Sequence, residues 1–136
     1  TVQNYPSEVR NDCSSDQSRA ARIGILFSGG IDSVVVTAIA CETDSIPNDE
    51  PIDLINVCFD RKSCHMSPDR LSAVQAWREL KLLYPKRFLR LIMVNEEYER
   101  SVDEWGRKVS GILGPCDSVM DFNVGLALWT AAKGNG

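Results

Sequence analysis

Apolar residues occur along the chain in two alternating patterns: short, nearly continuous runs, and longer stretches in which they recur at three- and four-residue steps. The short runs are rich in Ile, Leu, Val and Phe and are bounded by turn or charged residues, which is typical of strands buried in a parallel sheet. They are Ile23–Phe27, Asp53–Phe59 and Phe88–Val94. Because helix-like stretches separate them, the pattern predicts an α/β fold with a parallel sheet and flanking helices.

Apolar residues at helical spacing predict helices in the stretches between and after these strands. They run over Asp32–Cys41, Ser67–Leu83, Asn95–Ile112 and Asp121–Lys133. The apolar residues expected to form their buried faces are Val34, Val35, Ala38 and Ile39 in the first helix, Leu71, Val74, Trp77, Leu80 and Leu83 in the second, and Val124, Ala127, Leu128 and Ala131 in the last. Ser67 and Pro68 suit the start of the second helix, and Pro85 ends it.

Residues 1–19 differ from the rest in being polar, rich in Ser, Asp, Asn and Arg, and without apolar periodicity. We expect them to form a disordered polar leader. Residues 20–136 then form one domain, because a chain of 136 residues is too short for two comfortable hydrophobic cores.

Composition and charge narrow the class of protein. A net charge of −4 leaves no electrostatic footprint for non-specific nucleic-acid binding, so no nucleic-acid partner is expected. No apolar run reaches the roughly 20 residues needed to span a bilayer, and no signal peptide is present, so no membrane association is expected. The five cysteines are scattered and fit a reduced, cytoplasmic protein. Cys58, Cys64 and His65 lack a fourth ligand for zinc, and we interpret them as loop residues.

The candidate chemistry lies between the first strand and the first helix, in the segment Ser28-Gly29-Gly30-Ile31-Asp32-Ser33. Adjacent glycines let the backbone turn sharply and approach a ligand closely. The unsatisfied N–H groups at the start of the following helix favour an anion, and the serine hydroxyls add donors for phosphate oxygens. Asp32 would orient the loop or engage Mg²⁺. The segment therefore predicts a polyphosphate site, most simply for ATP.

The plain alternative is a glycine-rich turn with Asp or Ser capping a helix. Six residues in this order, after a strand and before a helix, favour the phosphate site. Neither the Walker pattern G-x-x-x-x-G-K-[ST] nor the dinucleotide pattern G-x-G-x-x-G is present. The segment is therefore not an ordinary kinase, GTPase or dinucleotide-binding loop.

The same segment resembles the SGGxDS PP-loop of the ATP pyrophosphatases, which cleave ATP between its α and β phosphates and have an adenine nucleotide alpha hydrolase-like fold. Within that superfamily, the chain from Ile25 to Gly134 is similar to the synthetase domain of asparagine synthetase, and in particular to the divergent eukaryotic proteins that contain this domain. The stretches that carry the resemblance are Leu26–Ser33, Asp49–Val57, Ser67–Arg70 and Cys116–Asp121.

The resemblance implies an adenylating domain that uses ATP and Mg²⁺. In the family, the aspartate side chain attacks the α phosphorus, and ammonia then displaces AMP from the β-aspartyl adenylate. The residues that would hold the pyrophosphate are Ser28, Gly29, Gly30, Asp32 and Ser33, with Asp32 as the metal candidate. Phe27 and Val57 would flank the adenine, although packing in the core explains both equally well. Ser67-Pro68-Asp69 matches a family motif, but a helix cap is the favoured interpretation.

Two departures from the family pattern qualify the functional prediction. The chain begins at Thr1 without the glutaminase domain that precedes the synthetase domain in the family. The family's second glycine-rich acidic motif, SGxGxDE, follows the helix that matches Asp121–Lys133, and the sequence ends at Gly136, before this motif would occur. We therefore expect an incomplete domain, from a fragment or short isoform of a longer protein whose glutaminase half is missing here.

Three functions stay open from the sequence. The first is an ATP-dependent carbon-nitrogen ligase of the glutamine-hydrolysing asparagine synthase type. The second is a non-catalytic remnant that binds nucleotide or another protein. The third, a PP-loop enzyme that modifies tRNA, is disfavoured by the absence of a basic face and of a C-x-x-C pair.

Overall fold

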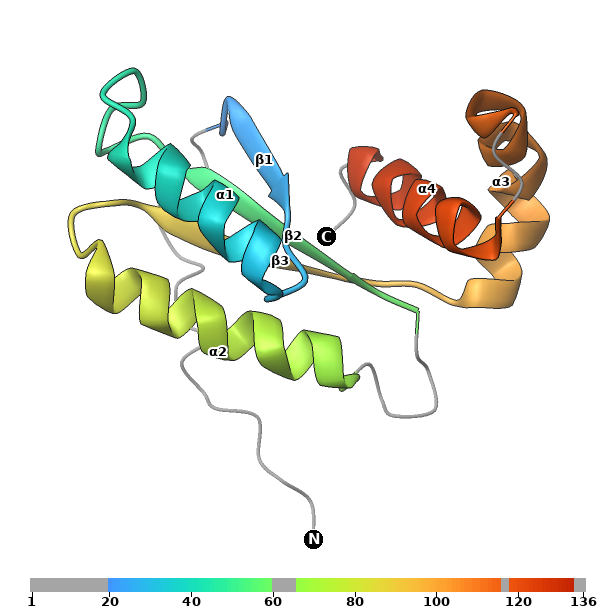
Figure 1. The fold of residues 1–136 in the computed structure, drawn as a ribbon, viewed down its shortest axis with the longest axis horizontal. Coiled ribbons are helices and arrows are strands. Elements are labelled where there is room, and N and C mark those ends of the chain that lie inside the picture. The colour runs from blue at the N-terminus through green and yellow to red at the C-terminus, as the bar shows by residue number, and fades with distance from the viewer. Residues whose placement is uncertain (1–19, 60–65, 116–117, 134–136) are drawn as a thin grey trace, which may run out of the picture.

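In the computed structural model the chain forms one parallel sheet with helices packed along it (Figure 1). The structure describes residues 20–59, 66–115 and 118–133. Its elements are β1 (Ile23–Leu26), α1 (Ile31–Glu42), β2 (Ile52–Cys58), α2 (Pro68–Leu83), β3 (Leu89–Asn95), α3 (Tyr98–Leu113) and α4 (Val119–Ala132). The predicted α/β fold is confirmed, while the predicted leader, residues 1–19, lies outside the described residues.

The described strands follow the order β1-β2-β3, and both pairs are parallel. Ile25 lies opposite Leu54, which lies opposite Leu91, so these side chains share one face of the sheet. The helices α1 and α2 pack against this face and against each other (Figure 1). The buried core consists of Ile25, Phe27, Cys41, Ile46, Ile52, Leu54, Ala73, Trp77, Leu80 and Leu89.

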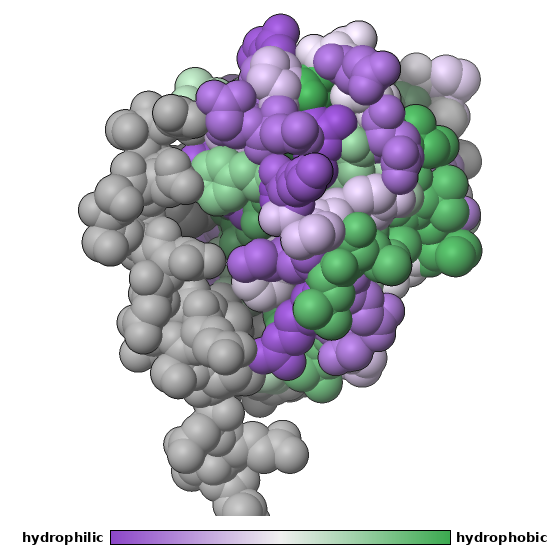
Figure 2. Space-filling model, turned by 90° about the vertical axis from the view of Figure 1, so that its left-hand side faces the viewer, coloured by the Kyte–Doolittle hydropathy of each residue, from purple (hydrophilic) through white to green (hydrophobic). Residues whose placement is uncertain are grey.

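The inward side of α1 differs from the predicted one. Val34 and Ala38 pack on the core as expected, but Thr37 and Cys41 complete the stripe. Val35 and Ile39, predicted to be buried, are exposed, and Figure 2 shows apolar residues gathered along one side of the molecular surface. The reason for the error is that α1 is apolar on nearly every side, so its sequence cannot indicate which stripe meets the sheet.

The inward side of α2 also differs in part. Trp77 and Leu80 are buried as predicted, whereas Leu71 and Leu83 are exposed. The remaining buried positions are Arg70 and Ala73, in the first two turns. A spacing of three and four residues identified the helix correctly but placed Leu71 on its inward side, whereas Arg70 and Ala73, which bracket Leu71 in the chain, are the residues that are buried there.

The helices α3 and α4 pack against each other, and α4 also lies against β2. The predicted inward face of α4 was wrong in part: Ala127 and Ala131 are half-buried, but Val124 and Leu128 are exposed, and the fully buried residues are Leu126 and Thr130. A β-carbon on Gly125 would lie 2.7 Å from Leu113 Cδ1. The missing side chain at Gly125 thus lets the two helices approach closely, a signal that a count of apolar residues overlooks.

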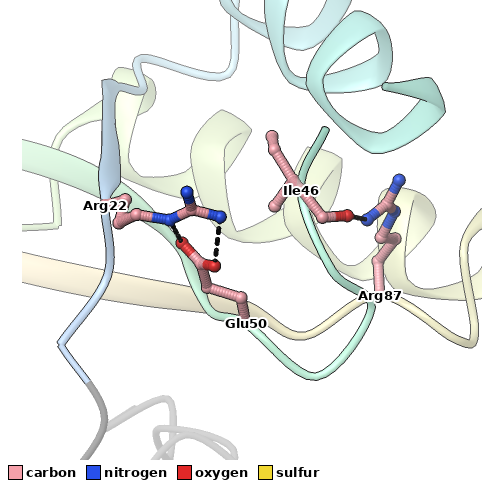
Figure 3. A network of polar contacts seen from close by, with 4 residues as sticks. All are labelled: Arg22, Ile46, Glu50 and Arg87. Atoms are coloured by element: carbon pink, nitrogen blue, oxygen red, sulfur yellow. Dashed lines mark hydrogen bonds and ion pairs between the residues drawn. The ribbon is translucent and has the colours of Figure 1, made fainter. Parts of the chain in front are cut away.

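Two arginines bind the segment between the end of α1 and the start of β2 (Figure 3). Arg87 donates to the carbonyl oxygens of Cys41 at 2.6 Å, of Thr43 at 2.8 Å, and of Ile46. These carbonyls lie at or just after the carboxyl end of α1, where a cation complements the helix dipole.

The second arginine, Arg22, pairs with Glu50 through two hydrogen bonds of 2.5 and 2.6 Å. These bonds lower the pKa of the Glu50 carboxyl below its ordinary value. The pair joins the segment that enters β1 to the one that enters β2.

Among the described helices, none has the length and apolar character to cross a membrane.

Candidate functional site: the glycine-rich loop at the carboxyl edge of the sheet

The predicted phosphate loop connects β1 to α1 at the carboxyl edge of the sheet, where ligands bind in open α/β folds (Figure 1). Phe27 N–H donates to the carbonyl oxygen of Ile55 at 2.7 Å, so the β1–β2 pairing continues one residue past the end of β1. The chain then turns through Ser28, Gly29 and Gly30, and α1 begins at Ile31.

The two glycines of this loop are needed for different reasons. Gly29 has φ +79°, and a β-carbon there would lie 2.4 Å from the backbone nitrogen of Ala73 in α2. Gly29 is therefore required by the turn and by its packing against α2. Gly30 has φ −71° and ψ 161°, which any residue can adopt, and its β-carbon would meet only Ser28 Oγ at 3.3 Å. A side chain at residue 30 thus requires only a small shift of the Ser28 hydroxyl.

The amino end of α1 has no side-chain cap. Its N-cap residue is Gly30, whereas Ser67 caps α2 and Ser118 caps α4 through their side-chain oxygens; α3, with Glu97 at its N-cap, also has no side-chain cap but does not follow a glycine-rich loop. Within the loop, Gly30 N–H donates weakly to Ser28 Oγ at 3.3 Å, and Ser33 Oγ donates to the Gly30 carbonyl at 2.9 Å. The first-turn N–H groups of α1 are therefore not covered by a side-chain acceptor, which suits an anion.

The structure brings together most of the predicted site residues. Ser28, Gly30 and Asp32 are exposed around the start of α1, and Gly29 and Ser33 lie in the same turn. Asp32 belongs to the first helical turn, and its carboxylate is of the type that would hold a Mg²⁺ ion at this end of α1. Among the described residues, no group of three or more His, Cys, Asp or Glu forms a metal site.

The two predicted adenine contacts have different positions. The Phe27 side chain is completely buried in the core, so its packing accounts for its presence. Val57 is half-buried and lies beyond the last β1–β2 pair, which joins Leu26 to Ile55.

Ser67 is the N-cap of α2 and accepts from Arg70 N–H at 3.3 Å, so the favoured helix-cap interpretation is confirmed.

Two residues near the loop were missed by the sequence analysis. Asn56 is buried in β2, and its Nδ2 donates to the Phe27 carbonyl at 2.7 Å. Arg70 is fully buried in the first turn of α2, and its Nε donates to Asn56 Oδ1 at 2.5 Å. The available signal was an amide inside an otherwise apolar strand. A charged residue at a helical position that faces the sheet was the second signal.

The observed class is thus a parallel α/β domain with a glycine-rich loop at the carboxyl edge of its sheet. The chain matches the asparagine synthase family over residues 11–98, which is more than half of its length, and it belongs to that family. The resemblance predicted from the loop and its neighbouring stretches is confirmed.

Its relatives include asparagine synthetase domain-containing protein 1 of Bos taurus, with 30% identity over 96% of this chain and 26% of the relative. Asparagine synthetase domain-containing protein CG17486 of Drosophila melanogaster is 34% identical over 87% of this chain and 22% of its own length. Protein YML096W of Saccharomyces cerevisiae, which carries the same domain name, is 30% identical over 84% of this chain and 23% of its own length. The chain thus spans about a quarter of the length of these curated relatives. No solved structure matches it.

Proposed function

We propose that this chain contains the ATP-binding loop of an asparagine-synthetase-type ligase, with Ser28, Gly30 and Ser33 and the amino end of α1 holding the pyrophosphate portion of ATP. The observation that carries the proposal is the helix start after β1, which lacks a side-chain cap and is bordered by exposed polar residues. Backbone N–H groups and the helix dipole both favour a phosphate there. Asp32 would hold the Mg²⁺ that offsets the charge of the phosphates.

The reaction proposed for the whole protein is the ATP-dependent adenylation of aspartate. A carboxylate oxygen of the aspartate side chain forms a bond to the α phosphorus, and the bond from that phosphorus to the bridging oxygen breaks, which releases pyrophosphate. Ammonia then displaces AMP and leaves an amide. Since the chain spans about a quarter of its curated relatives, this activity is proposed for the whole protein rather than for these residues alone.

The loop's contribution to that reaction would be positioning. Fixed donors on the phosphates hold the α phosphorus in place for attack, and positioning of this kind contributes up to about 7–11 kcal/mol in favourable cases. Contacts to the phosphates would dominate nucleotide affinity. Mg-ATP should therefore bind more tightly than AMP, and inorganic pyrophosphate should compete with ATP.

The binding test compares the wild-type chain with Gly30→Asp by calorimetry with Mg-ATP. Aspartate is a favoured N-cap residue, and the backbone at Gly30 accepts it, so the variant should fold as stably as wild type. Its carboxylate would cover the first-turn N–H groups and repel phosphate. We expect Mg-ATP binding by the wild-type chain and its loss in Gly30→Asp, with unchanged urea unfolding as the control.

The activity test follows pyrophosphate release by the whole protein with ATP, Mg²⁺, aspartate and ammonium. Release that depends on aspartate and disappears in Gly30→Asp is the expected result. No binding of Mg-ATP to a folded wild-type chain would overturn the proposed site. Binding without aspartate-dependent release would instead support the alternative, a nucleotide-binding or interaction module without ligase activity.

A further inference from the structure

Arg70 is a buried cation at the carboxyl edge of the sheet. Its side chain is fully buried, and within residues 20–59, 66–115 and 118–133 it makes no ion pair. Its Nε, Nη1 and Nη2 donate instead to uncharged oxygens: Asn56 Oδ1 at 2.5 Å, Asn95 Oδ1 at 2.9 Å and the Val94 carbonyl at 2.9 Å. Burying a charge without a counter-ion is costly. An apolar residue at this position could pack α2 against the sheet at a lower cost in free energy.

Asn56 connects this cation to the glycine-rich loop. A guanidinium only donates hydrogen bonds, so the amide oxygen of Asn56 must face Arg70 and its NH₂ group must face the other way. That NH₂ group donates to the carbonyl oxygen of Phe27 at 2.7 Å. Arg70 thus determines the orientation of the amide that holds the last residue before the loop.

The loop is held from a second side by the same helix. Gly29 packs directly against the backbone of α2 at Ser72 and Ala73, which lie two and three residues after Arg70. Phe27 is also held through its N–H by Ile55. One helix therefore contacts the loop directly and, through Asn56, restrains the residue at which it begins.

We propose that Arg70 is a positioning residue for anion binding: acting through Asn56, it holds the loop Ser28–Ser33 in the conformation that accepts the phosphates of ATP. The inference rests on the function proposed above and adds the residues that preorganise that site. A loop held in its binding conformation before the ligand arrives loses less freedom on binding, which raises affinity. Arg70 itself need not touch the ligand.

A matched pair of variants tests the connection. Asn56→Asp and Asn95→Asp both place a carboxylate beside Arg70, and both carboxylates can accept its hydrogen bond. Only Asn56→Asp removes the donor to the Phe27 carbonyl, because a carboxylate cannot donate. Two quantities are measured on each folded variant: Mg-ATP affinity by calorimetry, and hydrogen exchange of the Ser28, Gly29 and Gly30 amides without ligand.

We expect Asn56→Asp to weaken Mg-ATP binding about tenfold, as loss of one buried hydrogen bond would. Its loop amides should exchange faster by a similar factor, while Asn95→Asp should change both quantities by less than about twofold. Arg70→Lys keeps the charge but cannot present the fork of donors, so it should release the Asn56 amide and also speed loop exchange. This variant decides the question if Asn56→Asp does not fold.

Equal affinities and equal loop exchange in Asn56→Asp and Asn95→Asp would overturn the inference and leave Arg70 a structural residue. If the wild-type chain does not bind Mg-ATP, the proposed function fails, and the exchange measurement still decides whether Asn56 controls the loop. The two failures are therefore distinguishable. Wild-type binding with unchanged exchange in both Asn56→Asp and Arg70→Lys also contradicts the proposal.

Discussion

The backbone nitrogen of Ala73 lies 2.4 Å from the point where Gly29 would carry a β-carbon. No side chain fits at that distance from another backbone, and Gly29 also has a positive φ of 79°. The contact joins the loop after β1 to the second turn of α2. It shows that the first glycine of the pair serves the fold directly, by letting the loop lie against a helix far away in the sequence.

Gly29→Ala should therefore destabilise the protein strongly, whether or not a ligand is present. Positive φ in a residue with a side chain and a collision with a neighbouring backbone together predict a loss of about 3 kcal/mol in the free energy of unfolding. Gly30→Ala is the matched control, and it should change the free energy by less than about 1 kcal/mol, because its backbone suits alanine while alanine is a poorer N-cap than glycine. Urea unfolding measures both, and equal losses would show that the loop does not pack on α2 as described.

Arg87 should contribute more to stability than an arginine on the surface. Arg87→Ala leaves the carbonyls of Cys41, Thr43 and Ile46 without this donor and removes the cation from the end of α1. We expect a loss of about 2 kcal/mol in the free energy of unfolding. Arg100→Ala is the control: Arg100 is exposed and lies 4.0 Å from Glu104, and its loss should cost less than about 0.5 kcal/mol. A similar small loss for both variants would contradict the role given to Arg87.

The pair between Glu50 and Arg22 predicts a dependence of stability on pH. Hydrogen bonds from Arg22 lower the pKa of the Glu50 carboxyl below its ordinary value of 4.5. The ionised carboxylate therefore stabilises the folded protein above pH 4.5, and this contribution disappears as pH falls through the lower pKa of the folded state. Wild type should thus be more stable than Glu50→Gln at neutral pH, and the difference in the free energy of unfolding should shrink as the pH falls below 4.5.

Unfolding by urea from neutral pH down to about pH 3 checks this prediction. Arg22 is largely exposed, so the difference between wild type and Glu50→Gln should be small and should decrease with added salt. A difference that stays constant through the acid range would mean that Glu50 does not interact with Arg22 as an ion.

A pair of leucines tests the corrected orientation of α4. Leu126 is completely buried and Leu128 is 52% exposed, although the apolar pattern favours Leu128 as the inward residue. Leu126→Ala should lower the free energy of unfolding by about 2–5 kcal/mol. Leu128→Ala should change it by less than about 0.5 kcal/mol. The reverse order in thermal or urea unfolding would restore the orientation predicted from the sequence.

Much of the candidate site could be predicted from sequence because its signal is local. The order of residues from Ser28 to Ser33, between an apolar run and a helical stretch, already placed these residues in one turn at the carboxyl edge of a parallel sheet. The strands and helices could be predicted equally well, since a buried strand and an amphipathic helix each repeat a pattern within a few residues. The predicted strand ends and helix ends lie close to those observed, except that the helix predicted to begin at Asn95 begins at Tyr98, because Asn95 still belongs to β3.

What remained hidden depends on residues far apart in the chain. The pattern of α1 could not reveal that Thr37 faces the sheet and Ile39 does not, because neighbouring helices and strands decide which stripe is covered. Arg70 and Asn56 gained their roles only when α2 was laid across the ends of β2 and β3.

The sequence by itself thus determined the α/β class, the family and the glycine-rich loop, because each rests on residues adjacent in the chain. Only the tertiary structure separated Gly29, which packs against the backbone of α2, from Gly30, whose β-carbon would meet only the side-chain oxygen of Ser28. The two are identical in chemistry and adjacent in sequence. Their difference comes from a helix that begins 39 residues after Gly29 in the chain, and steric contact at that range leaves no trace in a local pattern.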